Sequence, residues 1–328
     1  MTTASRRRAE QRHVLVILCD QLRPDFLPVY GCPAVPCPNI ESLASNGTVF
    51  DRAISCCPVC APARASMMTG LYPSQHGVWT NDVPFNEGLD YLAEKMIALG
   101  YQTACFGKMH HYPATDLKGF QYGRQLEEYR LGTEEPYLKW LFEQCPELAE
   151  KQKRWCSHDV DEDGELFFPL DDELHYDRWI ATQVMDYLAQ HAKADTPQFM
   201  WLSSQGPHHP YNPPKRFKGC VNVDKLPALI PKPEGEICPI HHYREHLMPC
   251  FENNTLANMR KAYAESISHI DSQIGRVLQA LSDRGMLENT TILFSSDHGD
   301  QLGDHRLFEK GPFAYSSQLN VPLILSNH

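Results

Sequence analysis

Four strand-like runs, each ending in polar side chains, constrain the fold of this chain more than any other feature. These runs are His13 to Cys19, Tyr101 to Phe106, Gln198 to Ser204 and Thr290 to Ser296. Their apolar and β-branched residues are typical of strands buried on both faces. Segments of helical periodicity separate the runs, and the clearest of them covers residues 255–284. The alternation predicts an α/β fold, with a mostly parallel central sheet and helices on both faces.

The residues that follow these strands predict one shared site. In chain order they are Asp20-Gln21, Lys108 with His110, His208-His209 and Asp297-His298. The carboxyl ends of parallel strands lie at one edge of the sheet, where ligands bind in such folds. We therefore expect these side chains to meet.

Asp20, Gln21, Asp297 and His298 form a candidate metal site. Two carboxylates, an amide oxygen and an imidazole favour calcium, magnesium or manganese over a thiolate-bound zinc. The alternative is that Asp20 and Asp297 only cap helices after their strands.

Cys60 and Arg64 form a second candidate feature, at the predicted start of a helix over residues 60–70. A helix N-terminus and a nearby arginine both favour a thiolate or another negative group at Cys60. One alternative is a buried structural cysteine. Another is a redox or zinc pair formed by Cys57 and Cys60.

Charge and hydropathy exclude several classes of protein. The 328 residues include 30 Lys and Arg against 41 Asp and Glu, a net charge of −11. This balance disfavours nucleic-acid binding, which relies on attraction to phosphates. No run reaches the 18 apolar residues of a membrane helix, and no signal peptide is recognisable. We therefore expect a cytoplasmic protein whose 12 cysteines are mostly reduced.

We expect two regions, a loose N-terminus over residues 1–12 and a catalytic α/β domain over residues 13–328. Within the domain, residues 112–172 are acidic and irregular, and we interpret them as an insertion with little regular sheet. Residues 206–250 are rich in Pro, His and Cys, and a loop of this length is often functional. Both segments are predicted to shape the substrate side of the site.

The string CAPARASMMTG, from Cys60 to Gly70, resembles the sulfatase signature C-x-P-x-R followed by x-x-x-x-T-G. Five further matches occur in the family's order: Asp20-Gln21, Lys108-x-His110, His208-x-Pro210, Asp297-His298 and Lys310. The chain thus resembles the formylglycine-dependent sulfatases of the alkaline-phosphatase-like superfamily. Its matches are most similar to the choline sulfatase-like and iduronate sulfatase-like members.

The resemblance implies hydrolysis of a small-molecule sulfate ester to an alcohol and inorganic sulfate. A maturation enzyme would convert Cys60 into Cα-formylglycine, whose hydrate attacks sulfur. A divalent metal, Ca²⁺ in the first place with Mn²⁺ or Mg²⁺ as alternatives, would be held by Asp20, Gln21, Asp297, His298 and position 60. The first hydroxyl proton would pass to Asp297. Covalent catalysis of this kind divides one hard step into two easier ones.

The resemblance also implies roles for the remaining residues. Arg64, Lys108 and Lys310 would neutralise the transferring sulfuryl oxygens. His110 would take the proton that releases sulfate, and His208 would protonate the leaving alcohol. Asn81 is a candidate for facing the substrate, and Asp300 and His305 for supporting the metal ligands.

Two departures keep other functions open. Gln21 replaces a second aspartate, and His298 replaces an asparagine, of the commonest sulfatase pattern. Both variants resemble a subgroup that includes the choline sulfatase-like and iduronate sulfatase-like proteins and also phosphonate monoester hydrolases. The phosphonate hydrolases tend to lack the Lys-x-His pair, so Lys108 and His110 favour sulfate esters. The chain also ends two residues after the predicted strand Val321 to Ser326, so the family's small C-terminal subdomain is expected to be absent. Alternatives are therefore a phosphonate monoester or phosphodiester hydrolase, a non-catalytic truncated remnant, and a thiol-based metal or redox protein.

Overall fold

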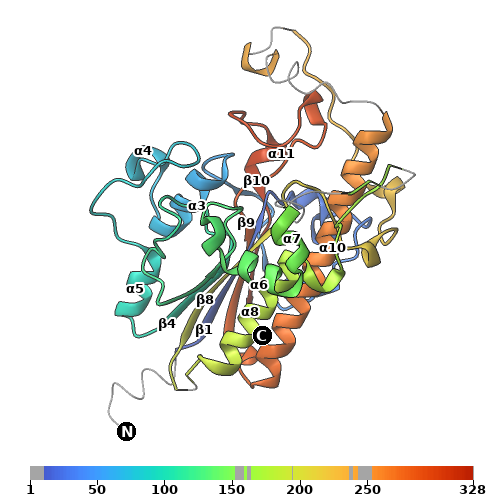
Figure 1. The fold of residues 1–328 in the computed structure, drawn as a ribbon. Coiled ribbons are helices and arrows are strands. Elements are labelled where there is room, and N and C mark those ends of the chain that lie inside the picture. The colour runs from blue at the N-terminus through green and yellow to red at the C-terminus, as the bar shows by residue number, and fades with distance from the viewer. Residues whose placement is uncertain are drawn as a thin grey trace.

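A seven-stranded sheet forms the centre of the molecule, in the order β2-β11-β9-β1-β8-β4-β5 (Figure 1). The computed structural model describes residues 11–151, 159–160, 164–193, 195–235, 239–242 and 253–327. β1 (His13–Asp20) lies between β8 (Gln198–Pro207) and β9 (Thr290–Ser296), parallel to both. β4 (Gln102–Gly107) pairs in parallel with β8 and with the edge strand β5 (Tyr122–Gln125). The predicted α/β fold is confirmed.

β1 shows why the sheet needs helices on both faces. Leu15, Ile17 and Cys19 pack into one apolar core, whereas Val16 and Leu18 pack into another. Successive side chains of a strand point to opposite faces, so an uninterrupted apolar strand is covered twice. The first core includes side chains from α2 (Pro38–Ser45), α8 (Tyr176–Gln190) and α10 (Asn253–Asp283). The second includes side chains from α3 (Cys60–Thr69) and α5 (Leu92–Ala98), on the opposite side of the sheet in Figure 1.

The long helix α10 follows the apolar stripe expected from the sequence. Its buried members are Ala262, Tyr263, Ile267, Ile270, Ile274, Val277, Leu278 and Leu281, and Met259 packs against them half-buried. The other face of α10 is polar. Within the described part of the chain, no helix is both long and apolar enough to span a bilayer.

The end of the chain differs from the single strand expected there. β10 (Asn320–Val321) pairs with β3 (Ala53–Ile54), and β11 (Leu323–Asn327) pairs antiparallel with β9 and with β2 (Gly47–Val49). Pro322 separates the two strands because proline has no backbone N–H to donate to a ladder.

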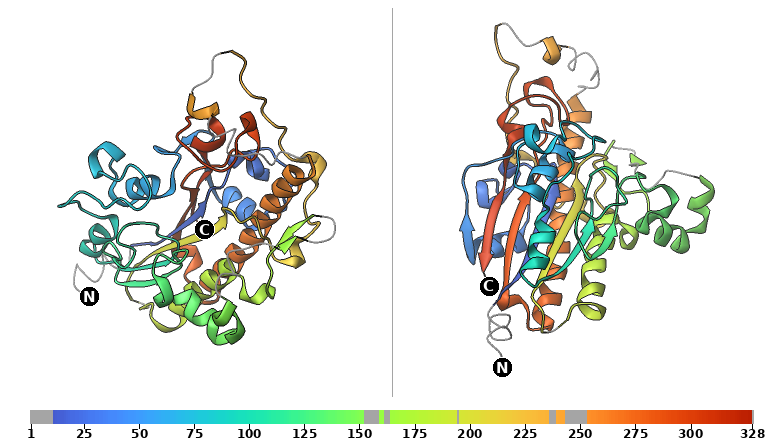
Figure 2. Two further views of the ribbon diagram at one scale, coloured as in Figure 1. Left: turned by 45° about the horizontal axis from the view of Figure 1, so that its top comes forward. Right: turned by 90° about the vertical axis from the view of Figure 1, so that its left-hand side faces the viewer.

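Residues 112–172 contribute more to the sheet than expected, since β5 lies within them. They also form α6 (Pro136–Gln144) and α7 (Pro146–Lys151), which project away from the sheet in the right-hand view of Figure 2. β6 (Asp159–Val160) and β7 (Leu166–Phe167) pair with each other. Parts of the predicted N-terminus and loop, residues 1–10, 236–238 and 243–252, lie outside the described residues.

The remaining elements are short. They are η1 (Pro24–Phe26), η2 (Pro28–Tyr30), α4 (Pro73–His76), η3 (Gly132–Glu134), η4 (Asp172–Leu174), η5 (Lys215–Phe217), η6 (Val223–Lys225), η7 (Leu287–Asn289), η8 (Asp304–Arg306) and α11 (Ser316–Leu319).

Candidate active site

The carboxyl ends of neighbouring parallel strands place the predicted residues at one edge of the sheet. Asp20 is the last residue of β1, and Asp297 follows β9 directly. Lys108 follows β4, and His208 follows β8. Because β9, β1, β8 and β4 are adjacent and parallel, the four side chains start from the same edge.

Cys60, the first residue of α3, lies among these strand ends. Its Sγ is 3.1 Å from His298 Nε2 and 3.7 Å from Asp20 Oδ1. The atoms of Asp20, Cys60, Asp297 and His298 that are able to bind a metal all lie within 4.8 Å of one another, and all four residues are buried. We call these residues the four-residue cluster.

The four-residue cluster attracts positive charge. His298 Nδ1 is 2.8 Å from the carbonyl oxygen of Gly299, so the ring turns Nε2 toward Cys60. Burial opposes protonation of His298, but Asp297 and Cys60 outweigh it and raise the pKa of His298 to about 9. A divalent cation would supply the same charge, and an imidazole fixed through its second nitrogen is a common metal ligand. The residues present therefore fit a metal.

Arg64 joins the two carboxylates of the cluster. Its Nε donates to Asp297 Oδ2 at 2.7 Å, and its NH2 group lies 3.2 Å from Asp20 Oδ2. A third contact joins NH1 to Ser203 Oγ at 2.7 Å. The planar guanidinium offers donors in a fixed fork, so one side chain sets the spacing of both carboxylates.

Lys108 supplies a second buried cation. Its Nζ lies 2.7 Å from Asp20 Oδ2 and 2.8 Å from Glu128 Oε1. Burial alone would favour protonation of Asp20, but Lys108 and the other nearby cations hold the pKa of Asp20 well below its usual range. Asp20 is therefore an ionised, metal-competent carboxylate at neutral pH.

Lys310 and His208 share a hydrogen bond. His208 Nδ1 lies 2.6 Å from the carbonyl oxygen of His209, which only accepts, so Nδ1 carries the ring hydrogen. His208 Nε2 then accepts from Lys310 Nζ. Burial, and after it the charge of Lys310, lowers the pKa of His208 well below its usual value. In this arrangement the proton of the pair resides on Lys310.

Gln21 lies beside the four-residue cluster, with its amide orientation fixed. Its Nε2 donates to Asp300 Oδ2, which also accepts from Tyr211 Oη at 2.6 Å. Because a carboxylate only accepts, Gln21 Oε1 must face the other way, where Lys310 Nζ donates to it at 3.0 Å. A ligand role for Gln21 remains a prediction.

His110 is buried next to Lys108 in an unusual backbone conformation, with φ at +54°. Its ring Nδ1 has no hydrogen-bond partner among the described residues. Burial, followed by the charges of Lys108 and Arg130, lowers the pKa of His110 well below its usual value. The ring is thus neutral and available as a base, which agrees with its predicted role without testing it.

Several contacts near the site were not predicted from the sequence. Glu127 and Glu128, in residues 112–172, contact the Lys108 segment, and nothing distinguished them from other acids there. Asn81 Oδ1 accepts from Ala61 N at 3.1 Å, in the first turn of α3, and its contact with the substrate stays a prediction. Asp300 Oδ2 accepts from Gln21 Nε2, and its role in supporting a metal ligand stays a prediction. His305 Nδ1 lies 3.2 Å from the carbonyl oxygen of Pro231, so this nitrogen faces the predicted loop over residues 206–250.

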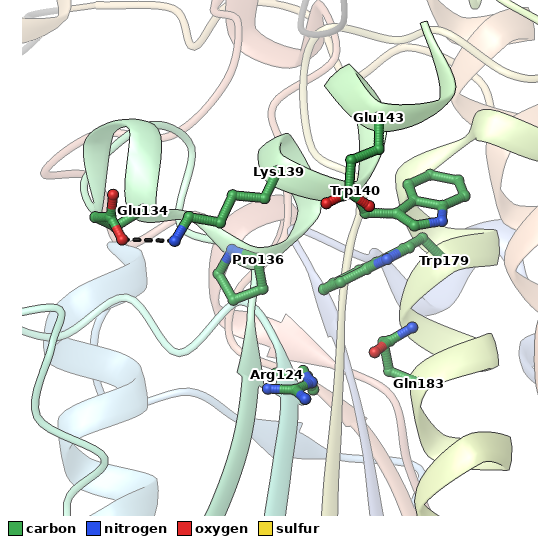
Figure 3. Close-up of a pocket in the computed structure, with 8 residues that line it drawn as sticks. All are labelled: Arg124, Glu134, Pro136, Lys139, Trp140, Glu143, Trp179 and Gln183. Carbon is green, nitrogen blue, oxygen red and sulfur yellow. Dashed lines mark hydrogen bonds and ion pairs between the residues drawn. The ribbon is translucent and has the colours of Figure 1, made fainter.

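A surface pocket of about 430 Å³ lies apart from these residues (Figure 3). Its walls come from β5, α6 and α8 and the segment before α6. They are Arg124, Glu134, Pro136, Lys139, Trp140, Glu143, Trp179 and Gln183, with an ion pair of 2.5 Å between Lys139 and Glu134. None of the predicted site residues lines this pocket.

A buried cysteine at a helix start, two buried carboxylates and the cations Arg64, Lys108 and Lys310 together define a hydrolase site of the alkaline-phosphatase-like class. Residues 12–327 match the Sulfatase family over almost the whole chain. The chain belongs to the sulfatase family, and the expectation of a sulfuric ester hydrolase is confirmed at that level.

Named relatives and solved structures agree with this assignment. The chain is 31% identical to an arylsulfatase of Clostridium perfringens, covering 95% of this chain and 68% of the relative. It is 28% identical to a choline-sulfatase of Rhizobium meliloti, over 96% of this chain and 62% of the relative. The solved structure of the phosphonate monoester hydrolase SpPMH of Silicibacter pomeroyi superposes with a TM-score of 0.82 at 25% identity. The match covers 96% of this chain and 68% of SpPMH. The chain therefore spans about two thirds of the length of these proteins.

Proposed function

We propose that this chain carries the active site of a sulfatase that hydrolyses a small-molecule sulfate ester to an alcohol and inorganic sulfate. The observation that carries the proposal is the position of Cys60, the signature cysteine. It begins α3 with its Sγ 3.1 Å from His298 Nε2 and 3.7 Å from Asp20 Oδ1. Membership of the sulfatase family supports the same reaction.

Two groups supplied after synthesis would complete this site. A formylglycine made from Cys60 by a maturation enzyme would supply, as its hydrate, an oxygen nucleophile that can later reform an aldehyde. A divalent metal, which we propose to be Ca²⁺, would act as a Lewis acid, held by Asp20, Asp297, His298 and position 60 with Gln21 beside them.

The residues of the chain then bind the anion and move protons. Arg64, Lys108 and Lys310 are preorganised cations in a buried site, where they stabilise negative charge more strongly than in water. Lys310 holds a proton against His208 Nε2, so this pair can protonate a leaving alcohol. His110, neutral and buried, can accept the proton whose loss expels sulfate.

Asp20 and Asp297 are both candidates for the first acceptor of the nucleophile's proton. Asp20 Oδ1 lies 3.7 Å from Cys60 Sγ, whereas both oxygens of Asp297 accept hydrogen bonds from Arg64 and backbone amides. We therefore propose Asp20, rather than Asp297, as the first acceptor of the nucleophile's proton.

A peptide mass spectrum across Cys60, on protein purified from its native host, tests the proposal. We expect a peptide that has lost the cysteine sulfur and gained an aldehyde oxygen. An unmodified thiol, in a host with a demonstrably active maturation enzyme, would falsify the catalytic interpretation.

Hydrolysis of phosphonate monoesters is the second candidate, because the structure superposes on SpPMH. Parallel rates on 4-nitrophenyl sulfate and on 4-nitrophenyl phenylphosphonate separate the two. We expect a higher kcat/KM for the sulfate. The reverse order would assign the chain to the phosphonate candidate.

A further inference from the structure

The turn after β5 places three charged side chains against the segment Lys108–His110. Glu127 is buried, and Arg130 joins it to Glu128. The guanidinium lies 3.2 Å from Glu127 Oε2 and 3.1 Å from Glu128 Oε2. We call Glu127, Glu128 and Arg130 the carboxylate turn.

Glu127 holds the backbone of the segment. Its Oε1 accepts from Met109 N at 2.7 Å and from His110 N at 3.2 Å, and its Oε2 accepts from His110 N at 3.1 Å. His110 has a φ of +54°, a left-handed conformation that a non-glycine residue keeps only when its surroundings hold it. The Glu127 carboxylate holds this conformation, because it accepts hydrogen bonds from two consecutive backbone amides.

Glu128 holds the side chain of Lys108. Its Oε1 lies 2.8 Å from Lys108 Nζ, which also lies 2.7 Å from Asp20 Oδ2. The ammonium is therefore fixed between a carboxylate of the four-residue cluster and a carboxylate of the turn. Arg130 makes this second carboxylate part of the same network as Glu127.

We propose that Glu127 is a positioning residue for the reaction. It fixes the backbone from which Lys108 and His110 project, while Glu128, tied to it by Arg130, fixes the Lys108 ammonium. The proposal rests on the proposed function, in which those two residues bind the transferring group and move a proton. A displacement of about 1 Å in such groups lowers a rate on the order of 10²-fold.

The same turn provides a matched control. Glu135 is also a buried glutamate, and it accepts a backbone hydrogen bond from Tyr129 N at 2.9 Å. Its carboxylate holds the backbone of the turn, at Tyr129 and at Glu127, and among the described residues it makes no hydrogen bond or ion pair with Lys108, Met109 or His110. Loss of this carboxylate perturbs the turn without releasing the catalytic segment.

The test compares Glu127→Ala, Glu127→Gln and Glu135→Ala in full-length enzyme whose formylglycine content is measured by mass spectrometry. Two quantities are measured: kcat and KM on 4-nitrophenyl sulfate, and amide hydrogen exchange of a peptide that covers residues 107–112. We expect Glu127→Ala to lower kcat by roughly 10² with KM changed less than about threefold, and to expose the amides of Met109 and His110. Glu127→Gln keeps an oxygen acceptor and should recover most of the loss. Glu135→Ala should leave both quantities near wild type.

Two results would overturn the proposal. One is unchanged exchange over residues 107–112 in Glu127→Ala. The other is an equal loss of kcat in Glu127→Ala and Glu135→Ala, which would reduce the turn to a purely structural role. A wild-type enzyme without sulfate ester activity would refute the proposed function instead, and the exchange measurement would still decide whether Glu127 holds the segment.

Discussion

Arg64 Nε donates to Asp297 Oδ2 at 2.7 Å, and both side chains are buried. The same guanidinium lies 3.2 Å from Asp20 Oδ2, so one cation compensates two buried carboxylates. Its contribution to stability can therefore be separated from its contribution to catalysis.

Replacement of Arg64 by methionine should destabilise the metal-free protein strongly. Removing one partner of a buried ion pair typically costs about 3–5 kcal/mol, because the other charge stays buried. Denaturant unfolding in EDTA measures this loss, and added Ca²⁺ should reduce it because the cation neutralises the same carboxylates. Lys139→Met is the control: its pair with Glu134 is exposed, so it should cost less than about 1 kcal/mol. An Arg64→Met protein as stable as wild type in EDTA would contradict the prediction.

Asp300→Asn should weaken metal binding although Asp300 is outside the four-residue cluster. Asp300 accepts from Gln21 Nε2 with one oxygen and from Leu302 N with the other, whereas asparagine has a single oxygen. One of these donors then faces an NH2 group, so the orientation of Gln21 Oε1 is weakened. Loss of such a supporting contact typically lowers metal affinity by about 10–100-fold. Calcium titration calorimetry measures the change. Tyr211→Phe, which removes a different donor to Asp300, should have the smaller effect, and equal affinities in wild type and Asp300→Asn would refute the argument.

His208 and Lys310 should act as one unit in catalysis. His208→Ala and Lys310→Ala should each lower kcat by about 10²–10⁴ on an alkyl sulfate, which needs protonation of its leaving group. The double variant should lose little more than the more damaging single variant, because either change destroys the same hydrogen bond. Losses on 4-nitrophenyl sulfate should be smaller. Independent, multiplying losses in the double variant would show that the two residues do not share a proton.

Glu265 should make the protein less stable as pH rises. Burial raises its pKa from a usual value near 4.5 to about 7. Below pH 4.5 the carboxyl is protonated in both the folded and the unfolded chain, and the contribution to stability is fully present. It is lost as pH rises through 7, where the folded state must bury a charge. Glu265→Gln keeps an acceptor for Gly219 N without that charge.

Urea unfolding of wild type and Glu265→Gln at several pH values checks this sign. The two proteins should be about equally stable at pH 4, and the variant should be the more stable by more than about 1 kcal/mol at pH 8. A difference that is independent of pH would mean that Glu265 does not titrate between these limits.

Much of the site was predictable because parallel strands end at one edge. The sequence places Asp20, Lys108, His208 and Asp297 at the end of buried strands or directly after them. Because these strands are adjacent and parallel, their carboxyl ends bring the four side chains to the same edge of the sheet. The four strands begin within one residue of the predicted positions, because β-branched and apolar runs have few other ways to bury both faces, whereas β8 extends beyond Ser204 to Pro207.

Long-range partners from irregular segments were not predictable. Glu127 and Glu128 lie in an acidic stretch without periodicity, and only the folded chain shows that β5 brings them to Lys108. The antiparallel direction of β11 was equally hidden, since the direction of a strand depends on the path of the chain before it. The hydrogen bond of Asn81 to the start of α3 was not predicted, because an amide caps a helix as readily as it faces a ligand.

The burial of Cys60 would set a time limit on its proposed conversion to formylglycine. The side chain has no exposed surface in the folded chain, so a maturation enzyme would have to reach it before the fold closes. Its closing partner His298 is synthesised 238 residues later. At about 5–20 residues per second, the ribosome leaves the cysteine without that partner for roughly 10–50 s. Under the proposed function, translation speed between Cys60 and β9 would therefore affect how much of the protein acquires the formylglycine.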